Sequence, residues 1–141
     1  MVEQRKNVRI IPPVSMQQIV PFTNHYDIGL FLCPPMNFNL RYALPNKLFE
    51  FIQARLTVAI GPNIEMKKVV EKYDCGLVAS DFQPQTLAKA LNALTVDKIM
   101  YYKEQAHKAA LELNADTNQR RIRSIINELL TDGDFSLSKE H

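Results

Sequence analysis

The stretch Asn39-Leu-Arg-Tyr-Ala-Leu-Pro-Asn-Lys-Leu-Phe-Glu-Phe-Ile-Gln-Ala-Arg-Leu-Thr-Val-Ala-Ile60 decides how this chain folds. Pro45 fits the first position of a helix, where its missing N–H is not needed and its fixed φ is already helical. An apolar run of strand length, residues 28–33, ends at Pro34 ahead of this helix, and a second run, residues 57–61, follows it. The order strand, helix, strand predicts one unit of a parallel sheet.

The same alternation of apolar runs and helical patterns extends over most of the chain. It is typical of a parallel sheet covered by helices on both faces. We expect strands at residues 8–11, 28–33, 57–61 and 76–79. We expect helices at residues 16–24, 45–54, 64–72, 84–94, 96–113 and 116–130. The predicted fold class is α/β with a Rossmann-like sheet in a domain of residues 1–130, and residues 131–141 are predicted to be a disordered tail.

The composition fits one globular domain and argues against several functions. A chain of 141 residues with 46% hydrophobic content can form a core. Its 17 basic and 15 acidic residues give a formal charge of only +2, which does not predict nucleic-acid binding. No apolar run approaches the ~18 residues that a membrane span needs. The dinucleotide motif G-x-G-x-x-G and the phosphate-loop motif G-x-x-x-x-G-K-[ST] are both absent.

Cysteine and histidine placement predicts neither a metal site nor a redox site. Cys33 and Cys75 lie in apolar, strand-like contexts, which favours buried thiols in a reducing compartment. His25, His107 and His141 are scattered and form no triad or ligand set. We therefore expect a cytoplasmic protein without a bound metal.

The start of the helix at residues 45–54 carries the candidate ligand-binding groups. Lys47 in the first turn opposes the helix dipole at a cost of roughly 0.3–1 kcal/mol, and a nearby anion reverses that sign. Free N–H groups at a helix start bind phosphates. Glu50, one turn after Asn46, is placed to accept hydrogen bonds from vicinal hydroxyls. An ordinary surface Lys–Glu pair explains these residues about equally well.

Residues 44–60, with Pro-Asn-Lys-Leu-Phe-Glu at the helix start, resemble the C-terminal, donor-binding domain of glycosyltransferases of the B fold, of the glycosyl transferases group 1 type. The resemblance runs from about residue 7 to about residue 130. It implies that Glu50 binds the ribose hydroxyls and that Asn46 and Lys47 lie beside the diphosphate of a nucleotide-sugar. Asn39 and Tyr42 belong to a loop, residues 37–44, that would face the donor sugar, and many relatives have a Glu where this chain has Tyr42.

The resemblance also implies a reaction. A sugar would pass from a nucleotide-diphosphate donor to a glycan or a lipid-linked acceptor, with no further cofactor, and Lys47 would stabilise the leaving diphosphate as the catalytic group. Acceptor binding would need an N-terminal domain, so we expect an incomplete half of a two-domain enzyme that is inactive alone. Arg120, Arg121 and Arg123 are candidate contacts with anionic lipid at the inner membrane face, or simply a solvated face.

Two strands of that family's sheet would precede residue 7. Without them, the strand at residues 28–33 would have one unpaired edge. We expect either that the strand at residues 8–11 moves beside it or that two chains dimerise through this edge.

Other interpretations of the sequence remain open. A sugar-nucleotide epimerase of the same fold would also use a ribose-binding glutamate, and a non-catalytic α/β interaction module would bind no nucleotide. Gly61, in the turn at residues 61–63, either permits close approach of donor sugar or phosphate or simply forms a turn between strand and helix.

Overall fold

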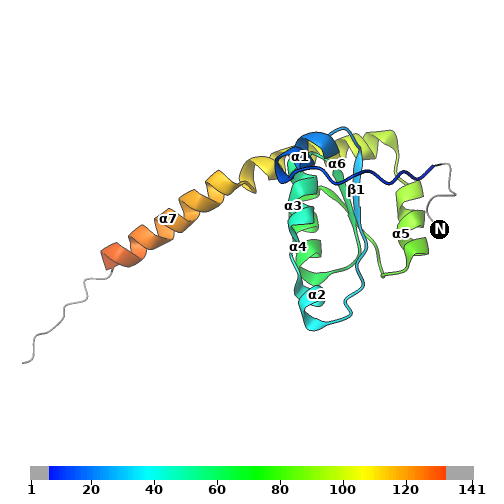
Figure 1. Cartoon of the computed structure of the whole chain (residues 1–141). Helices are drawn as coiled ribbons and strands as arrows, with labels where there is room; N and C mark the ends of the chain where they lie inside the picture. The colour runs from blue at the N-terminus through cyan, green and yellow to red at the C-terminus, as the bar shows by residue number, and fades with distance from the viewer. Residues whose placement is uncertain (1–6, 133–141) are drawn as a thin grey trace, which may run out of the picture.

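The computed structural model describes residues 7–132 and has an α/β fold built on a three-stranded parallel sheet (Figure 1). The strands are β1 (Ile28–Phe31), β2 (Thr57–Ile60) and β3 (Gly76–Val78), in the spatial order β1-β2-β3. The helices are α1 (Met16–Thr23), α2 (Phe38–Tyr42), α3 (Asn46–Gln53), α4 (Ile64–Tyr73), α5 (Pro84–Asn92), α6 (Val96–Glu112) and α7 (Ala115–Asp132). The predicted α/β class with a parallel sheet is confirmed.

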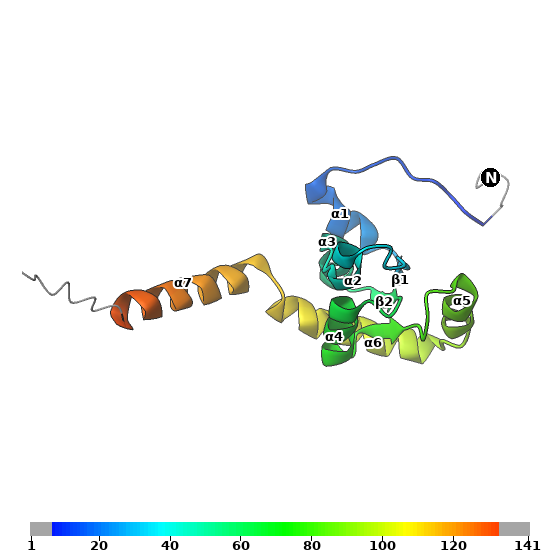
Figure 2. The ribbon, with the colours of Figure 1, turned by 90° about the horizontal axis from the view of Figure 1, so that it is seen from below.

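Strand β2 lies at the centre of the sheet, and all four of its residues are buried. Val58 and Ile60 pack against α3, α4 and α6, whereas Ala59 packs against Leu87 of α5. Figure 2 shows α5 on one side of the strands and α3 and α4 on the other. The predicted covering of both faces by helices is therefore confirmed, and it explains why β2 reads as a continuous apolar run.

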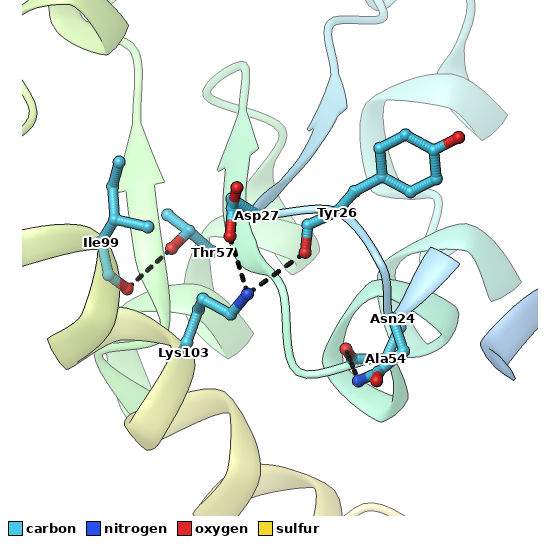
Figure 3. A network of polar contacts seen from close by, with 7 residues as sticks. All are labelled: Asn24, Tyr26, Asp27, Ala54, Thr57, Ile99 and Lys103. Atoms are coloured by element: carbon cyan, nitrogen blue, oxygen red, sulfur yellow. Dashed lines mark hydrogen bonds and ion pairs between the residues drawn. The ribbon is translucent and has the colours of Figure 1, made fainter. Parts of the chain in front are cut away.

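A polar network fastens α6 to the amino ends of β1 and β2 (Figure 3). The buried hydroxyl of Thr57 donates to the carbonyl of Ile99 at 3.1 Å. The ammonium of Lys103 lies 2.9 Å from a carboxylate oxygen of Asp27 and 3.2 Å from the carbonyl of Tyr26. These contacts lie at the amino edge of the sheet, whereas the loops that follow β1 and β2 lie at the opposite, carboxyl edge.

The predicted strand at residues 8–11 is wrong. Residues 8–15 form an irregular segment without a backbone hydrogen bond to the sheet, and Ile10 is 76% exposed. Pro12 and Pro13 follow directly and have no backbone N–H, so this short run cannot be extended by further hydrogen bonds to a neighbouring strand. Its predicted move beside β1 is also wrong, since the outer edge of β1 pairs with no strand in residues 7–132. Dimerisation through that edge stays a prediction.

Several local boundaries also differ from the predictions. Pro45 is the N-cap of α3, with extended φ and ψ of −72° and 149°, so the helix begins one residue later than expected. The predicted loop at residues 37–44 contains α2, whose N-cap Asn37 accepts a hydrogen bond from the N–H of Leu40 at 2.8 Å. Residues 131 and 132 of the predicted tail belong to α7, and residues 133–141 lie outside the described part of the chain.

Candidate functional site

Helix α3 begins at the carboxyl edge of the sheet with its first turn open to an anion. Leu48 and Ile52 are buried against the sheet, and this fixes the orientation of the helix. Its N-cap Pro45 provides no side-chain acceptor, and its first turn contains no acidic residue. The N–H of Leu48 donates to the carbonyl of Pro45 at 3.1 Å, which leaves the N–H groups of Asn46 and Lys47 to bind a negatively charged group.

Lys47 lies over the end of β1. Its side chain is exposed, and its ammonium lies 5.7 Å from the ring centroid of Phe31, the last residue of β1. The cation is thus at the carboxyl end of a parallel strand, which is where open α/β sheets bind ligands.

Asn46 points to a different neighbourhood from Lys47. It lines an open cavity of about 580 Å³ between α3 and the junction of α6 and α7, together with Phe49, Gln53, Leu113, Asn114, Ala115 and Asn118. The amide of Gln53 closes one side of this region by donating to the carbonyls of Ala110 and Leu113, at 3.1 and 2.8 Å. Glu50 follows one turn after Asn46 and is half-buried.

Asn39 and Tyr42 both lie on α2, and both are exposed. The ring of Tyr42 lies 4.9 Å from that of Phe38, and the guanidinium of Arg41 lies 5.9 Å from the Tyr42 ring. Within residues 7–132, no side-chain hydrogen bond joins any two of the five predicted site residues. The structure therefore brings them to neighbouring helices without forming a preassembled cluster.

A second helix start lies close by, at α4. Its N-cap Asn63 is only 3% exposed, and the side-chain amide donates to the carbonyls of Cys33 and Leu40, at 3.1 and 3.3 Å. These bonds connect α4 to the loop after β1 and to α2. The carbonyl oxygen of the Asn63 side chain has no hydrogen-bond partner in the described residues, which is uncommon for a buried polar atom.

The surface beside Asn63 forms a smaller cavity of about 270 Å³, lined by Pro35, Arg41, Pro62, Asn63, Ile64 and Phe82. Arg41 brings a second cation to the carboxyl edge of the sheet. We did not predict Arg41 or Phe82 as site residues, and Asn63 entered only as part of a turn. An N-cap residue directly after a strand was the available signal for Asn63, whereas nothing in the local sequence distinguished Arg41 from any exposed arginine.

Packing accounts for Gly61. A Cβ at this position would lie 2.8 Å from the ring of Phe82 and 3.0 Å from the side chain of Leu32. The close approach that requires glycine is therefore made by side chains of this chain, which favours the interpretation of residues 61–63 as a turn between strand and helix.

The two cysteines differ in environment. Cys75 is fully buried, and this burial raises the pKa of its thiol to about 11. Cys33 is only partly buried, and both thiols are free. The prediction of buried thiols is confirmed for Cys75 and wrong for Cys33. Strand β1 ends at Phe31, so Cys33 lies in the loop after the strand. No group of His, Cys, Asp and Glu residues in the described chain is arranged to hold a metal ion.

These features define an α/β domain with two helix starts and two cations at the carboxyl edge of a parallel sheet. No protein-family model, curated protein or solved structure matches the chain. No helix within residues 7–132 has the length and apolar character to cross a membrane.

Proposed function

We propose that this chain is the nucleotide-sugar-binding domain of a glycosyltransferase of the B fold. The observation that carries the proposal is the position of Lys47, over the last residue of β1 and in the uncapped first turn of α3. A lysine that opposes the helix dipole at a sheet edge is explained by an anion bound there. The diphosphate of a sugar donor is such an anion.

The neighbouring residues support the other parts of a donor. Glu50 lies one turn further along α3, within reach of ribose hydroxyls if the diphosphate lies at the helix start. Arg41, Asn39 and Tyr42 on α2 supply a cation and polar groups on the sugar side. Charge that develops on the leaving diphosphate would be stabilised by Lys47 and the N–H groups of α3. Transfer to a glycan or lipid-linked hydroxyl would additionally need an acceptor-binding domain.

The decisive test is a calorimetric titration of the full chain with uridine diphosphate and with guanosine diphosphate. Saturable binding of either nucleotide supports the proposal, and the preferred one identifies the base. Absence of binding by a chain whose circular dichroism shows it to be folded would favour a non-catalytic interaction module. Conversion of a bound nucleotide-sugar into its epimer would favour the epimerase.

A further inference from the structure

Helix α7 extends away from the sheet and its covering helices (Figures 1 and 2). Its apolar side chains form one stripe along the helix, and each is about half exposed or more. The α7 stripe consists of Ile122 (56% exposed), Ile125 (55%), Ile126 (49%), Leu129 (69%) and Leu130 (72%). An exposed stripe with this spacing is typical of a surface that packs against another helix.

The spacing of the stripe follows a heptad. With Ile122 and Leu129 at positions a, Ile125 falls at d and Ile126 at e, while Leu130 falls at b, one turn after Ile126. Arg121 and Glu128 then both occupy position g, where charges decide the orientation and identity of the partner helix.

We propose that the α7 stripe binds the same stripe of a second copy of this chain, with the two helices antiparallel. In an antiparallel pair, the g flank of one helix faces the g flank of the other. Ile122 then packs against the partner's Ile125, and Arg121 lies opposite the partner's Glu128. The two-fold axis repeats this ion pair, as expected for an interface that uses the same surface twice. In a parallel pair, Arg121 would face the partner's Ile126 and find no acceptor.

The contacts of these charges within one chain are compatible with such a pairing. Arg121 lies 3.6 Å from Glu112, and Glu128 accepts a hydrogen bond from Ser124 at 3.1 Å. Arg121, Ser124 and Glu128 are exposed and the side chain of Glu112 is 41% exposed, so these contacts are weak and can rearrange.

The charge balance of α7 favours a second copy over a lipid surface. Its three basic residues, Arg120, Arg121 and Arg123, are matched by Asp116, Glu128 and Asp132. An interfacial helix on anionic lipid depends on excess positive charge, which α7 lacks.

Sedimentation equilibrium of the full chain tests the proposal from about 5 to about 500 µM, a range chosen because a pair of short helices is only marginally stable. The average mass should rise from 16.2 kDa toward twice that value. Ile122→Asp should weaken association at least about tenfold, because it places a charge in the apolar contact. Asn127→Asp is the matched control, since it adds the same charge at heptad position f, away from the α7 stripe, and should leave association unchanged.

A charge exchange tests the orientation. Arg121→Glu and Glu128→Arg should each weaken association, and the double variant should restore it, because each ion pair re-forms with its charges reversed. A parallel pair predicts no such restoration, so its absence would overturn the antiparallel arrangement.

Three other outcomes would overturn the proposal. The first is a mass that stays at 16.2 kDa over the whole range. The second is association that survives Ile122→Asp, as pairing through the edge of β1 would. The third is a monomer that floats with phosphatidylserine vesicles and loses this binding in Ile122→Asp. Circular dichroism and thermal melting of Ile122→Asp should match the unmodified chain, because the α7 stripe lies outside the core.

Discussion

At the scale of single residues, Lys47 experiences two opposing effects in the absence of ligand. Its charge opposes the dipole of α3 at a cost of roughly 0.3–1 kcal/mol. Its position 5.7 Å from the Phe31 ring contributes roughly 0.5–1 kcal/mol in the other direction. The helix dipole alone predicts that Lys47→Ala slightly stabilises the chain. The dipole and the contact with the Phe31 ring together predict a change in the free energy of unfolding close to zero.

Lys47→Ala should therefore weaken binding of uridine diphosphate more than binding of uridine, while the free energy of unfolding changes by less than about 1 kcal/mol. Calorimetry with both ligands and urea denaturation measure the two quantities. Lys89→Ala, which removes an exposed lysine from α5 on the other face of the sheet, is the control. Unchanged diphosphate affinity in the Lys47 variant would reduce Lys47 to an ordinary surface cation.

Glu50→Gln should weaken nucleoside binding, because hydrogen bonds to a charged acceptor are worth about 1.5–3 kcal/mol. The loss corresponds to at least about tenfold in the dissociation constant of uridine or guanosine. The melting temperature should barely change, since Glu50 makes no ion pair in the described structure. Glu71→Gln, an exposed carboxylate on α4, serves as the matched control. Equal nucleoside affinities of the Glu50 variant and the unmodified chain would show that Glu50 does not contact the nucleoside.

Cys75 makes the free energy of unfolding depend on pH in the alkaline range. Burial raises the pKa of its thiol from its ordinary value of 9.0 to about 11, so the folded state holds the proton more tightly than the unfolded chain. The stabilisation is complete below pH 9.0 and is lost as the pH rises toward about 11. Denaturant unfolding of the unmodified chain should lose more free energy over this interval than Cys75→Ala does. Cys33→Ala should retain the steeper dependence, and a shallow one would contradict the assignment to Cys75.

At the scale of elements, the pairing of β2 with β3 depends on Gly76. Val58 and Gly76 are register partners, and a Cβ at position 76 would lie 1.8 Å from the carbonyl oxygen of Val58. Because that neighbour is backbone in the central strand, relief requires β3 to move away from β2. Gly76→Ala should therefore destabilise the chain by at least about 1–3 kcal/mol, the usual range for overpacking.

Urea denaturation checks the effect of Gly76→Ala. Gln85→Ala, on the exposed surface of α5, should leave the midpoint unchanged. A midpoint for the Gly76 variant equal to that of the unmodified chain would show that β3 tolerates displacement from β2.

The helix starts at the carboxyl edge differ in whether an acidic side chain of this chain already lies beside them. At α5, the carboxylate of Asp81 accepts hydrogen bonds from the N–H of Gln83 and the hydroxyl of Thr86, so an internal anion already occupies that start. At α3 no acidic residue lies in the first turn. The first turn of α4 contains Glu65, so this contrast favours the start of α3 as the anion-binding part of the candidate site.

At the scale of the whole molecule, the sheet has two different edges. The contacts of Lys103 with Asp27 and of Thr57 with Ile99 hold α6 against the amino ends of the strands. The amide of Asn24 donates to the carbonyl of Ala54 at 2.7 Å and ties the end of α1 to the end of α3 (Figure 3). The carboxyl ends instead carry α2 and the starts of α3 and α4, where the candidate site lies.

The local sequence by itself determined the three strands of the sheet, helix α1 and the helices from α3 onward. Their signals are apolar runs and helical spacing, which act over a few residues and need no partner to be recognised. The same local reasoning identified Lys47 and Glu50, because a helix start and its dipole are set by neighbouring residues.

Only the tertiary structure decided the remaining features. Residues 8–11 have a strand-like pattern but no neighbouring strand, and strand pairing is a contact between distant segments. Helix α2, with five residues, is too short to be stable alone, and the amide of Asn63 holds it through the carbonyl of Leu40. Asn46 faces the junction of α6 and α7 because Gln53 bonds to carbonyls nearly sixty residues later in the chain. Contacts of such range leave no trace in local periodicity.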